Sequence, residues 1–518
     1  MAALPSFPED FNLAHYYLDA RVEEGRGDRV AVAVGDEERT YAEVQARANR
    51  VADALRARVI GSDDRVLMLL YDGFEFVETW FGLLKAGGVF CMANPLGTAA
   101  DFAYLLAYTR CRAVVADAAV MDRLAPLLAD HPECHVRWVV GDGEAGDAFE
   151  GWERFEDALA DASPETRTAK TSRDDIAGWL FTSGTTGKPK GAVHLHRHFA
   201  FNTEVFAKRT LGLRSDDVFV SVSRLYFGYA TGTNLMFPFA VGGKAVLFRE
   251  KPTADRLFDH IEKHGVTVLT NVPAMIRQMV DAEREVDLST VRIALSAGEA
   301  LPPELYARWK ERFPSAELCD GIGSAEMFHI FITNKPGDVT PGSLGRIVEG
   351  YEARVVGPGG EDVAEGEIGR LHIAGDSTAL CYWRRQDASR DTFQGRWCIT
   401  QDLFRRDAEG LFWYAGRADD MLKVRGQWVS PLEIEDCLAT HPAVRECAVV
   451  GIADDAGLTI PKAFVVLREG REASEALAAE LQEHAKTTLT RYKFPREVAF
   501  LGELPRNDRG KVMRRSLR

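Results

Sequence analysis

The sequence lacks the patterns that mark several large classes of protein. Its eight cysteines are scattered and no two stand in a C-x-x-C arrangement, which argues against a disulfide scaffold, a zinc site and a thiol-redox motif. No apolar run approaches the roughly 20 residues that cross a bilayer. The first residues contain no basic segment followed by an apolar one. These absences predict a protein of the reducing cytoplasm, with free thiols and no membrane partner.

Positive charge is also scarce. The 518 residues include 63 Lys and Arg against 78 Asp and Glu, so the net charge is −15. Sequence-independent binding to DNA or RNA needs clustered Lys and Arg, and we therefore expect no nucleic-acid partner. Apolar residues, in contrast, are abundant: they make up 46% of the chain, which predicts a well-packed globular protein. The length suggests about three or four structural units.

Apolar runs alternate with helical periodicity from residue 39 to about residue 343. The pattern predicts a helix over 41–57 with Thr40 as its N-cap, a strand over 65–70, a helix over 74–85 and a strand over 113–116. Such alternation favours parallel sheets covered by helices. Residues 86–115 and 241–268 share a Gly pair, a Pro, an Ala-Asp and an apolar run. A structural repeat with two sheets is one interpretation, and chance similarity of tight turns is the other.

The pattern changes after about residue 340. Between 339 and 417, short alternating segments bounded by Gly indicate an antiparallel barrel or distorted sheet. Further on, helices over 431–440 and 474–488 and strands over 446–452 and 462–467 predict a small α+β unit. We therefore expect an α/β fold with a domain over 1–418, built from two stacked doubly wound sheets and a barrel-like subdomain, and a second domain over 419–518.

The strongest local signal is the segment from Leu180 to Gly191. A strand over 176–181 leads into hydroxyls and glycines followed by two lysines. Glycine N–H groups can converge on anionic oxygens, hydroxyls donate further hydrogen bonds and lysine adds charge, so the segment predicts a phosphate-binding loop. It is not a Walker A loop, because Pro189 follows the lysine. The expected phosphate ligands are Thr182, Ser183, Gly184, Thr185, Thr186, Gly187, Lys188 and Lys190.

This segment resembles the signature of the adenylate-forming superfamily, which includes acyl- and aryl-CoA ligases, luciferases and adenylation domains of peptide synthetases. The resemblance covers essentially the whole chain and implies a C-terminal domain that is mobile during the reaction. Further motifs follow in the family's order: Thr40-Tyr41-Ala-Glu-Val, Ser296-Ala-Gly-Glu299, Asp320-Gly-Ile-Gly-Ser-Ala-Glu326, Gln401-Asp402, Gly416-Arg-Ala-Asp-Asp420 and Pro505-Arg-Asn-Asp-Arg-Gly-Lys511.

The resemblance implies roles for individual residues. Glu326 would hold Mg²⁺ through a hard oxygen ligand. Asp402 would accept hydrogen bonds from the ribose, with Arg417 nearby. Lys511 would stabilise the charge of the adenylation step, and Asp419 would be the hinge. ATP would also contact Ala297, Gly298, Glu299, Asp320, Gly321, Ile322 and Ser324, and coenzyme A would pass Lys423 and Gly426.

Three positions depart from the family's pattern without removing an essential group. Ala325 replaces the Thr that usually precedes the glutamate, and Gln401 replaces a Gly in the ribose motif. Trp428 stands where some acyl-CoA synthetases carry an Arg that contacts phosphate. These departures affect individual contacts rather than the reaction.

Within the superfamily the closest resemblance is to benzoate-CoA ligases, with a further likeness to 2-aminobenzoate (anthranilate) CoA ligases. It is carried by Tyr226-Phe-Gly-Tyr229, by Asp320 to Ile330 and by Asp419-Asp-Met-Leu-Lys-Val424. It implies a benzoate-sized acid without a bulky para substituent. Glycines would leave flat space for the ring, and a histidine would either orient a polar group or simply pack. The implied pocket residues are Gly228, Tyr229, Gly323, His329 and Ile330.

Other functions stay open at this point. A stand-alone aryl-acid adenylating enzyme could load a carrier protein, although the sequence contains no fused carrier domain. A nucleotide-binding regulator without catalysis is disfavoured by the retained motif residues. His194, His196 and His198 alternate, and on a strand they would share one face as metal ligands could; their place after the phosphate loop favours the nucleotide's surroundings instead. We expect a monomer or a homodimer.

Overall fold

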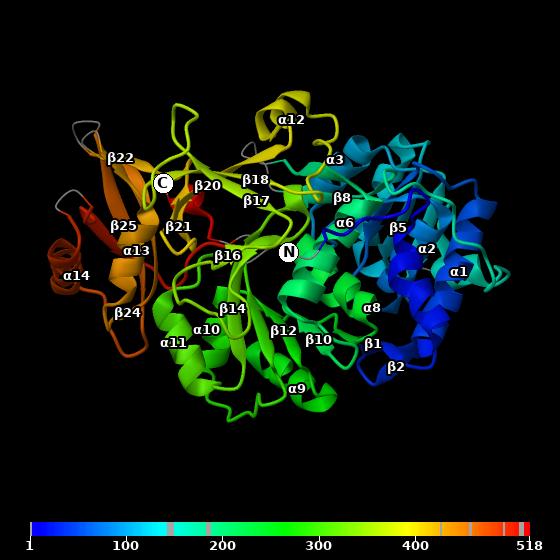
Figure 1. Cartoon of the computed structure of the whole chain (residues 1–518), viewed down its shortest axis with the longest axis horizontal. Helices are drawn as coiled ribbons and strands as arrows, with labels where there is room; N and C mark the ends of the chain where they lie inside the picture. Colours follow the sequence, from blue (N-terminus) through cyan, green and yellow to red (C-terminus); the bar gives the residue numbers. More distant parts are fainter. Residues whose placement is uncertain are drawn as a thin grey trace.

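The protein is described here by a computed structural model. It describes residues 3–141, 150–182, 188–424, 427–454, 458–490, 493–506 and 512–517. In these residues the strands form two large sheets, a five-stranded antiparallel sheet and a C-terminal group (Figure 1). The seven-stranded sheet lies at one end of the long axis and the C-terminal elements lie at the other.

The first large sheet has seven strands and is parallel except at one edge. Its order is β7 (Glu153–Arg154), β6 (Val136–Val140), β5 (Ala113–Asp117), β3 (Arg65–Leu69), β4 (Val89–Met92), β8 (Ile176–Thr182) and β9 (Lys190–Leu195). Only the β8–β9 pair is antiparallel. The inner strands are buried continuous apolar runs, as expected for strands covered on both faces.

The second large sheet has nine strands. Its order is β16 (Arg346–Ile347), β15 (Ile330–Thr333), β14 (Glu317–Gly323), β13 (Ile293–Ser296), β12 (Val268–Asn271), β10 (Val218–Ser221), β11 (Lys244–Leu247), β1 (Val30–Val34) and β2 (Glu37–Thr40). The strands from β14 to β1 are parallel, and antiparallel strands extend both edges.

The weak sequence repeat is a structural repeat. In the first sheet β3 lies between β4 and β5, and in the second β10 lies between β11 and β12 in the same arrangement. The Gly pairs occupy matching positions, because Gly87 and Gly242 have φ of 92° and 79° and end the helix before the strand. A residue with a side chain is strained at such φ values. The interpretation as two related sheets is therefore confirmed.

Helices cover both sheets, and one core joins them. Apolar side chains of both sheets and of the helices between them form a single buried cluster. The helices of this part are α1 (Tyr41–Ala57), α2 (Phe74–Ala86), α3 (Ala99–Thr109), α4 (Met121–Leu124), α5 (Phe155–Leu159), α6 (His196–Asn202), α7 (Gly228–Thr231), α8 (Phe237–Val241), α9 (Ala254–His264), α10 (Pro273–Asp281), α11 (Pro303–Arg312) and α12 (Gln386–Thr392), with π-helical turns at η1 (His15–Asp19) and η5 (Thr203–Thr210).

The first predicted helix illustrates how local sequence sets its own start. The Thr40 hydroxyl accepts from the Glu43 N–H while the Glu43 carboxylate accepts from the Thr40 N–H, a capping box that satisfies two otherwise unpaired donors. Helix α1 then packs closely on α2, because a Cβ at Gly82 would lie 2.4 Å from Val51. The predictions for this helix and for the next strand, helix and strand are confirmed.

The region after residue 340 forms an antiparallel sheet of β17 (Glu352–Val356), β18 (Ile368–Ala374), β20 (Trp397–Arg406), β19 (Phe393–Gln394) and β21 (Phe412–Arg417). The C-terminal part follows, with a separate buried core. It contains the hairpin of β22 (Leu422–Val424) and β23 (Gln427–Val429), strands β24 (Val444–Ala453), β25 (Thr459–Leu467) and β26 (Glu497–Phe500), and helices α13 (Pro431–Ala439) and α14 (Glu475–Thr488). The four elements predicted beyond residue 430 are present.

None of the helices in the described ranges has the length and apolar character needed to cross a membrane.

Candidate active site

The predicted phosphate-binding segment connects two paired strands. Thr182 ends β8, Lys190 begins β9, and the two face each other in the antiparallel register. Lys188 is exposed and its Nζ lies 5.2 Å from the ring of Tyr104, whereas Lys190 is partly buried. The other expected ligands fall outside the described residues: Ser183, Gly184, Thr185, Thr186 and Gly187.

Glu326, the expected magnesium ligand, follows the carboxyl end of β14 in a 3₁₀ turn, η7 (Ala325–Met327). Its Oε1 accepts a hydrogen bond of 2.5 Å from the hydroxyl of Tyr382. Lys190 Nζ lies 4.0 Å from the ring of the same tyrosine. Burial lowers the pKa of Lys190, and the carboxylate of Glu326 opposes this shift. The structure thus joins the phosphate-binding segment to this glutamate through one tyrosine.

These donors fit a cation that is shared with a nucleotide. Mg²⁺ usually takes one or two carboxylates together with substrate phosphates and water. No described residue donates a hydrogen bond to Oε2 of Glu326, and the described ranges contain no group of three or more His, Cys, Asp or Glu suited to a metal. A single hard carboxylate beside a phosphate-binding segment fits the magnesium of Mg·ATP.

Glu299 lies after the carboxyl end of β13 and contacts the C-terminal part of the chain. Its Oε1 accepts from the N–H of Val512 at 3.1 Å, and Arg506 Nη1 lies 3.5 Å from each carboxylate oxygen. Arg506 also pairs with Glu446 at 2.5 Å. The preceding Gly298 has φ of 95°, which favours glycine, and Ala297 is buried. The carboxylate of Glu299 thus binds Arg506 and Val512, which stand on either side of Lys511 in the sequence.

The 320–324 motif is largely built into the sheet. Asp320 is buried in the middle of β14, and burial raises the pKa of its carboxyl to about 7, opposed by a hydrogen bond with Ser296. Gly321 and Ile322 pair with β15. Ser324 Oγ is buried without a partner among the described residues. A Cβ at Gly323 would lie 2.5 Å from the carbonyl oxygen of His329. This glycine is therefore required by the close approach of β14 and β15, and its place in the acyl pocket stays a prediction.

Asp402 and Arg417 face each other across the paired strands β20 and β21. Arg417 Nη1 lies 3.8 Å from Asp402 Oδ1, and its Nε donates to Asp419 at 2.9 Å. Burial raises the pKa of the Cys398 thiol, and the carboxylates of Glu326 and Asp402 raise it further. Both carboxylates therefore lie near enough to this thiol to raise its pKa, although 76 residues of sequence separate them.

The implied acyl pocket gathers at α7 and the start of β15. Gly228 begins α7, and a Cβ there would lie 3.1 Å from Leu180. His329 is buried and its Nε2 donates to the Tyr229 carbonyl at 3.0 Å, while its Nδ1 has no partner among the described residues. Burial lowers the pKa of His329 to about 4, so the ring is neutral. Ile330 is buried, and the Tyr229 hydroxyl also lacks a partner among the described residues.

The three alternating histidines do not lie on one strand face. His194 is on β9, whereas His196 and His198 are on α6, so the strand arrangement considered from the sequence is wrong. His194 Nε2 donates to the carbonyl of Ala325 at 2.7 Å. His196 Nδ1 accepts from the N–H of Leu13. All three rings are buried in the interior, and burial lowers their pKa values.

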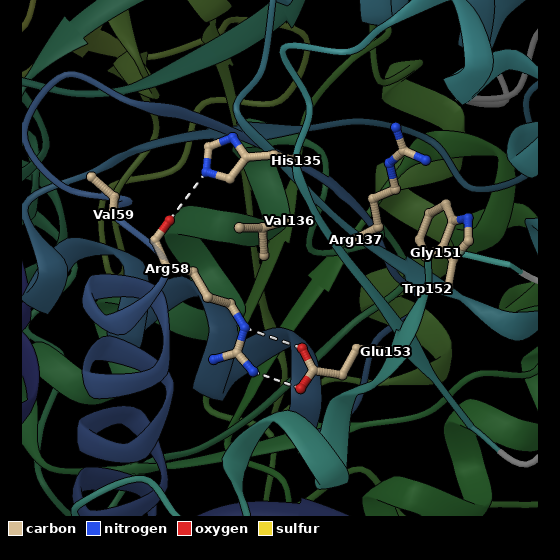
Figure 2. Close-up of a pocket in the computed structure, with 8 residues that line it drawn as sticks. All are labelled: Arg58, Val59, His135, Val136, Arg137, Gly151, Trp152 and Glu153. Carbon is tan, nitrogen blue, oxygen red and sulfur yellow. Dashed lines mark hydrogen bonds and ion pairs between the residues drawn. The ribbon is translucent and has the colours of Figure 1, made fainter.

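A separate hollow of about 430 Å³ lies elsewhere on the chain (Figure 2). Figure 2 shows Arg58 paired with Glu153 and the ring of His135 next to the Arg58 carbonyl. His135 precedes β6, so the hollow is at the amino ends of the parallel strands. The phosphate-binding segment follows the carboxyl end of β8 in the same sheet, which is the edge where α/β sheets bind ligands. The hollow is therefore distinct from the candidate active site.

The structure describes two of the four site residues expected in the C-terminal part. Lys423 is exposed on β22, and Asp419 is exposed between β21 and β22. Gly426 and Lys511 lie outside the described residues. The sequence did not single out Tyr382, because its neighbours Cys381 and Trp383 form no recognisable motif with it.

Two adjoining α/β sheets, with a phosphate-binding segment and carboxylates after the carboxyl ends of their strands, define a nucleotide-binding enzyme fold with a small C-terminal unit. The chain belongs to the AMP-binding enzyme family, whose model matches residues 18–383, and the AMP-binding enzyme C-terminal domain matches residues 433–511. The family predicted from the motifs is thereby confirmed.

Similar proteins are known along the full length. A benzoate-CoA ligase of Thauera aromatica is 38% identical over 516 residues, covering 99% of this chain and 96% of the relative. A crystal structure of an anthranilate CoA ligase with anthranoyl-AMP has a TM-score of 0.93 at 35% identity, covering 99% of this chain and 97% of that one. A benzoate CoA ligase of Burkholderia xenovorans has a TM-score of 0.90 at 38% identity, covering 98% and 100%.

Proposed function

We propose that the protein is an ATP-dependent aryl-CoA ligase (AMP-forming) that acts on benzoate or 2-aminobenzoate. The observation that carries this proposal is the full-length likeness to benzoate- and anthranilate-CoA ligases. The site supports it, because the phosphate-binding segment, a magnesium-type carboxylate and the implied acyl pocket all follow carboxyl ends of strands in the two sheets. ATP and coenzyme A are its co-substrates, and Mg²⁺ is its metal ion.

The reaction has two steps. A carboxylate oxygen of the acid forms a bond to the α-phosphorus of ATP while the bond to the bridging oxygen breaks, which gives acyl-AMP and pyrophosphate. The sulfur of coenzyme A, after losing its proton, then attacks the acyl carbon, and the carbon–oxygen bond to AMP breaks. Positioning and charge stabilisation supply most of the catalysis in such transfers. Bound magnesium would neutralise the phosphate charge.

The chain's own groups would serve the first step as follows. Glu326 would hold the cation, Lys190 would add positive charge beside the phosphates, and Asp402 would bind the ribose. Arg506 and Val512, which flank the segment of Lys511, both contact Glu299 next to the nucleotide motifs. This supports a role of the lysine in adenylation, where a fixed ammonium lowers the barrier.

The aryl group would lie between α7 and the start of β15. His329 is neutral and donates through Nε2 to Tyr229, so its Nδ1 is an acceptor without a partner among the described residues. An acceptor there could orient an ortho amino group, which favours testing 2-aminobenzoate beside benzoate. No carboxylate stands at position 228, so an α-ammonium group would find no counter-ion.

We also infer that the chain divides into domains 1–418 and 419–518, with Asp419 as the hinge. The separate C-terminal core and the strand gap between Arg417 and Leu422 support this division. Lys423 and Gly426 would then border the path of coenzyme A. The scattered free thiols support a cytoplasmic location.

The test is a screen of ATP–pyrophosphate exchange followed by kcat/KM with coenzyme A. We expect benzoate and 2-aminobenzoate to lead 4-hydroxybenzoate and a medium-chain fatty acid. A ranking led by the fatty acid would contradict the pocket assignment. Exchange without consumption of coenzyme A would instead point to an adenylating enzyme that loads a carrier protein, an alternative that the likeness to CoA ligases does not favour.

A further inference from the structure

The backbone around Glu326 is held at three successive carbonyls. The carbonyl before it accepts from His194 Nε2 at 2.7 Å, its own carbonyl accepts from the N–H of Ala379 at 2.8 Å, and the carbonyl after it accepts from Ser377 Oγ at 2.8 Å. The path of the chain at this glutamate is therefore fixed. What stays variable is the rotation of its side chain, which decides where the carboxylate oxygens point.

Tyr382 acts on that remaining freedom. Its hydroxyl donates to Glu326 Oε1 at 2.5 Å, and an ionised carboxylate can only accept. The tyrosine is itself held firmly: its backbone bridges Ala192 of β9, its ring packs on Phe393, and only 4% of the residue is exposed. The hydroxyl thus occupies one oxygen of the glutamate, and the other, Oε2, accepts from no described donor and is available to a cation.

We propose that Tyr382 is a positioning residue that orients the carboxylate of Glu326 for Mg·ATP, an inference that rests on the proposed function. Hydrogen-bond partners behind a metal ligand fix its orientation, and their loss typically weakens metal binding by about 10–100-fold. Lys190, 4.0 Å from the ring of Tyr382, makes this tyrosine the common neighbour of the phosphate-binding segment and the metal ligand.

The chain contains a matched control in the same chemical arrangement. The Tyr16 hydroxyl donates to Glu204, and Lys208 Nζ lies 5.2 Å from the Tyr16 ring. These residues belong to η1 and η5. Among the described residues, no hydrogen bond or ion pair joins them to Glu326 or Lys190. Tyr16→Phe therefore removes a phenol–carboxylate hydrogen bond from a place that the inference does not involve.

The binding test uses Mn²⁺ as a spectroscopic substitute for Mg²⁺. Mn²⁺ affinity is measured by electron paramagnetic resonance with a non-hydrolysable ATP analogue and no acid. Tyr382→Phe should weaken it about tenfold or more, and Tyr16→Phe should leave it at the wild-type value. The Mg²⁺ concentration that gives half-maximal ATP–pyrophosphate exchange should rise in parallel, while thioester formation from supplied acyl-AMP should be unchanged.

A double-mutant cycle separates positioning from a structural role. In the background of Glu326→Ala, the further change Tyr382→Phe should weaken Mn²⁺ binding little, because the carboxylate that Tyr382 orients is already gone. Wild-type Mn²⁺ affinity in Tyr382→Phe, or additive losses in the cycle, would overturn the inference. Wild-type protein without any exchange activity would instead contradict the proposed function itself, so the two failures are distinguishable.

Discussion

Replacing Glu299 by Gln should impair adenylate formation and spare thioester formation. In the structure this carboxylate accepts a hydrogen bond of 3.1 Å from the N–H of Val512, and it lies 3.5 Å from Arg506 Nη1. Both residues flank the segment of Lys511. The contact therefore docks the part of the chain that the first half-reaction needs, and removing its charge should shift the C-terminal domain away from that position.

The size of the effect follows from the two contacts. The side chains of Glu299 and Arg506 are about a quarter exposed (24% and 27%), so the ion pair is worth only about 1 kcal/mol. A hydrogen bond to a charged acceptor contributes about 1.5–3 kcal/mol, and glutamine keeps a weaker version of it. A combined loss of about 2 kcal/mol corresponds to a factor of about 30. Because only docked molecules adenylate, the rate should fall by up to this factor.

The assay measures the half-reactions separately. ATP–pyrophosphate exchange reports adenylation, and release of AMP from supplied acyl-AMP and coenzyme A reports the second step. The affinity of Glu299→Gln for ATP should change little. This measurement distinguishes a loss of domain docking from the loss of a direct contact with the nucleotide. Glu304→Gln is the matched control, because Glu304 also pairs with a C-terminal residue, Arg468, at 2.8 Å, but the pair is more exposed (42% and 34%).

We expect the control to lose no more than about fivefold in exchange, in line with an exposed pair worth at most about 1 kcal/mol. An equal loss in both half-reactions of Glu299→Gln would show that the glutamate does not act through docking. A loss that appears entirely as weaker ATP binding would assign it to the nucleotide instead.

Three further predictions follow from the same structure. Lys511→Ala should slow adenylation by about 10²–10³-fold and spare the second half-reaction, checked by the same two assays; equal losses would refute its role. Asp419→Pro fixes φ near −65° and should damage one half-reaction selectively, with wild-type rates in both as the contrary result. Burial lowers the pKa of His329 to about 4, so the folded protein resists its protonation and loses stability as pH falls from about 6.5 toward 4. His329→Gln should remove about 2–3 kcal/mol of that loss, measured by urea unfolding at pH 7 and 4.5, and an unchanged pH dependence would contradict the assignment.

Sequence by itself determined the elements and the family. Helix α1 could be predicted because its periodicity and its Thr40–Glu43 cap lie within one stretch of chain. The two Gly pairs, whose first members Gly87 and Gly242 have positive φ, could reveal the sheet repeat because turn geometry depends on few residues. The phosphate-binding segment was visible for the same reason. Hydroxyls, glycines and lysines that act together stand next to one another in the chain.

Tertiary structure alone decided which of these groups meet. Tyr382 lies 56 residues from Glu326, His194 lies 131 residues from Ala325, and Val512 lies 213 residues from Glu299. It also showed that Gly323 permits the close approach of β14 and β15. Local patterns report the conformation of a segment, because they reflect its own hydrogen bonds and its apolar face. Contacts between distant residues depend on strand order and packing, which no single stretch of sequence encodes.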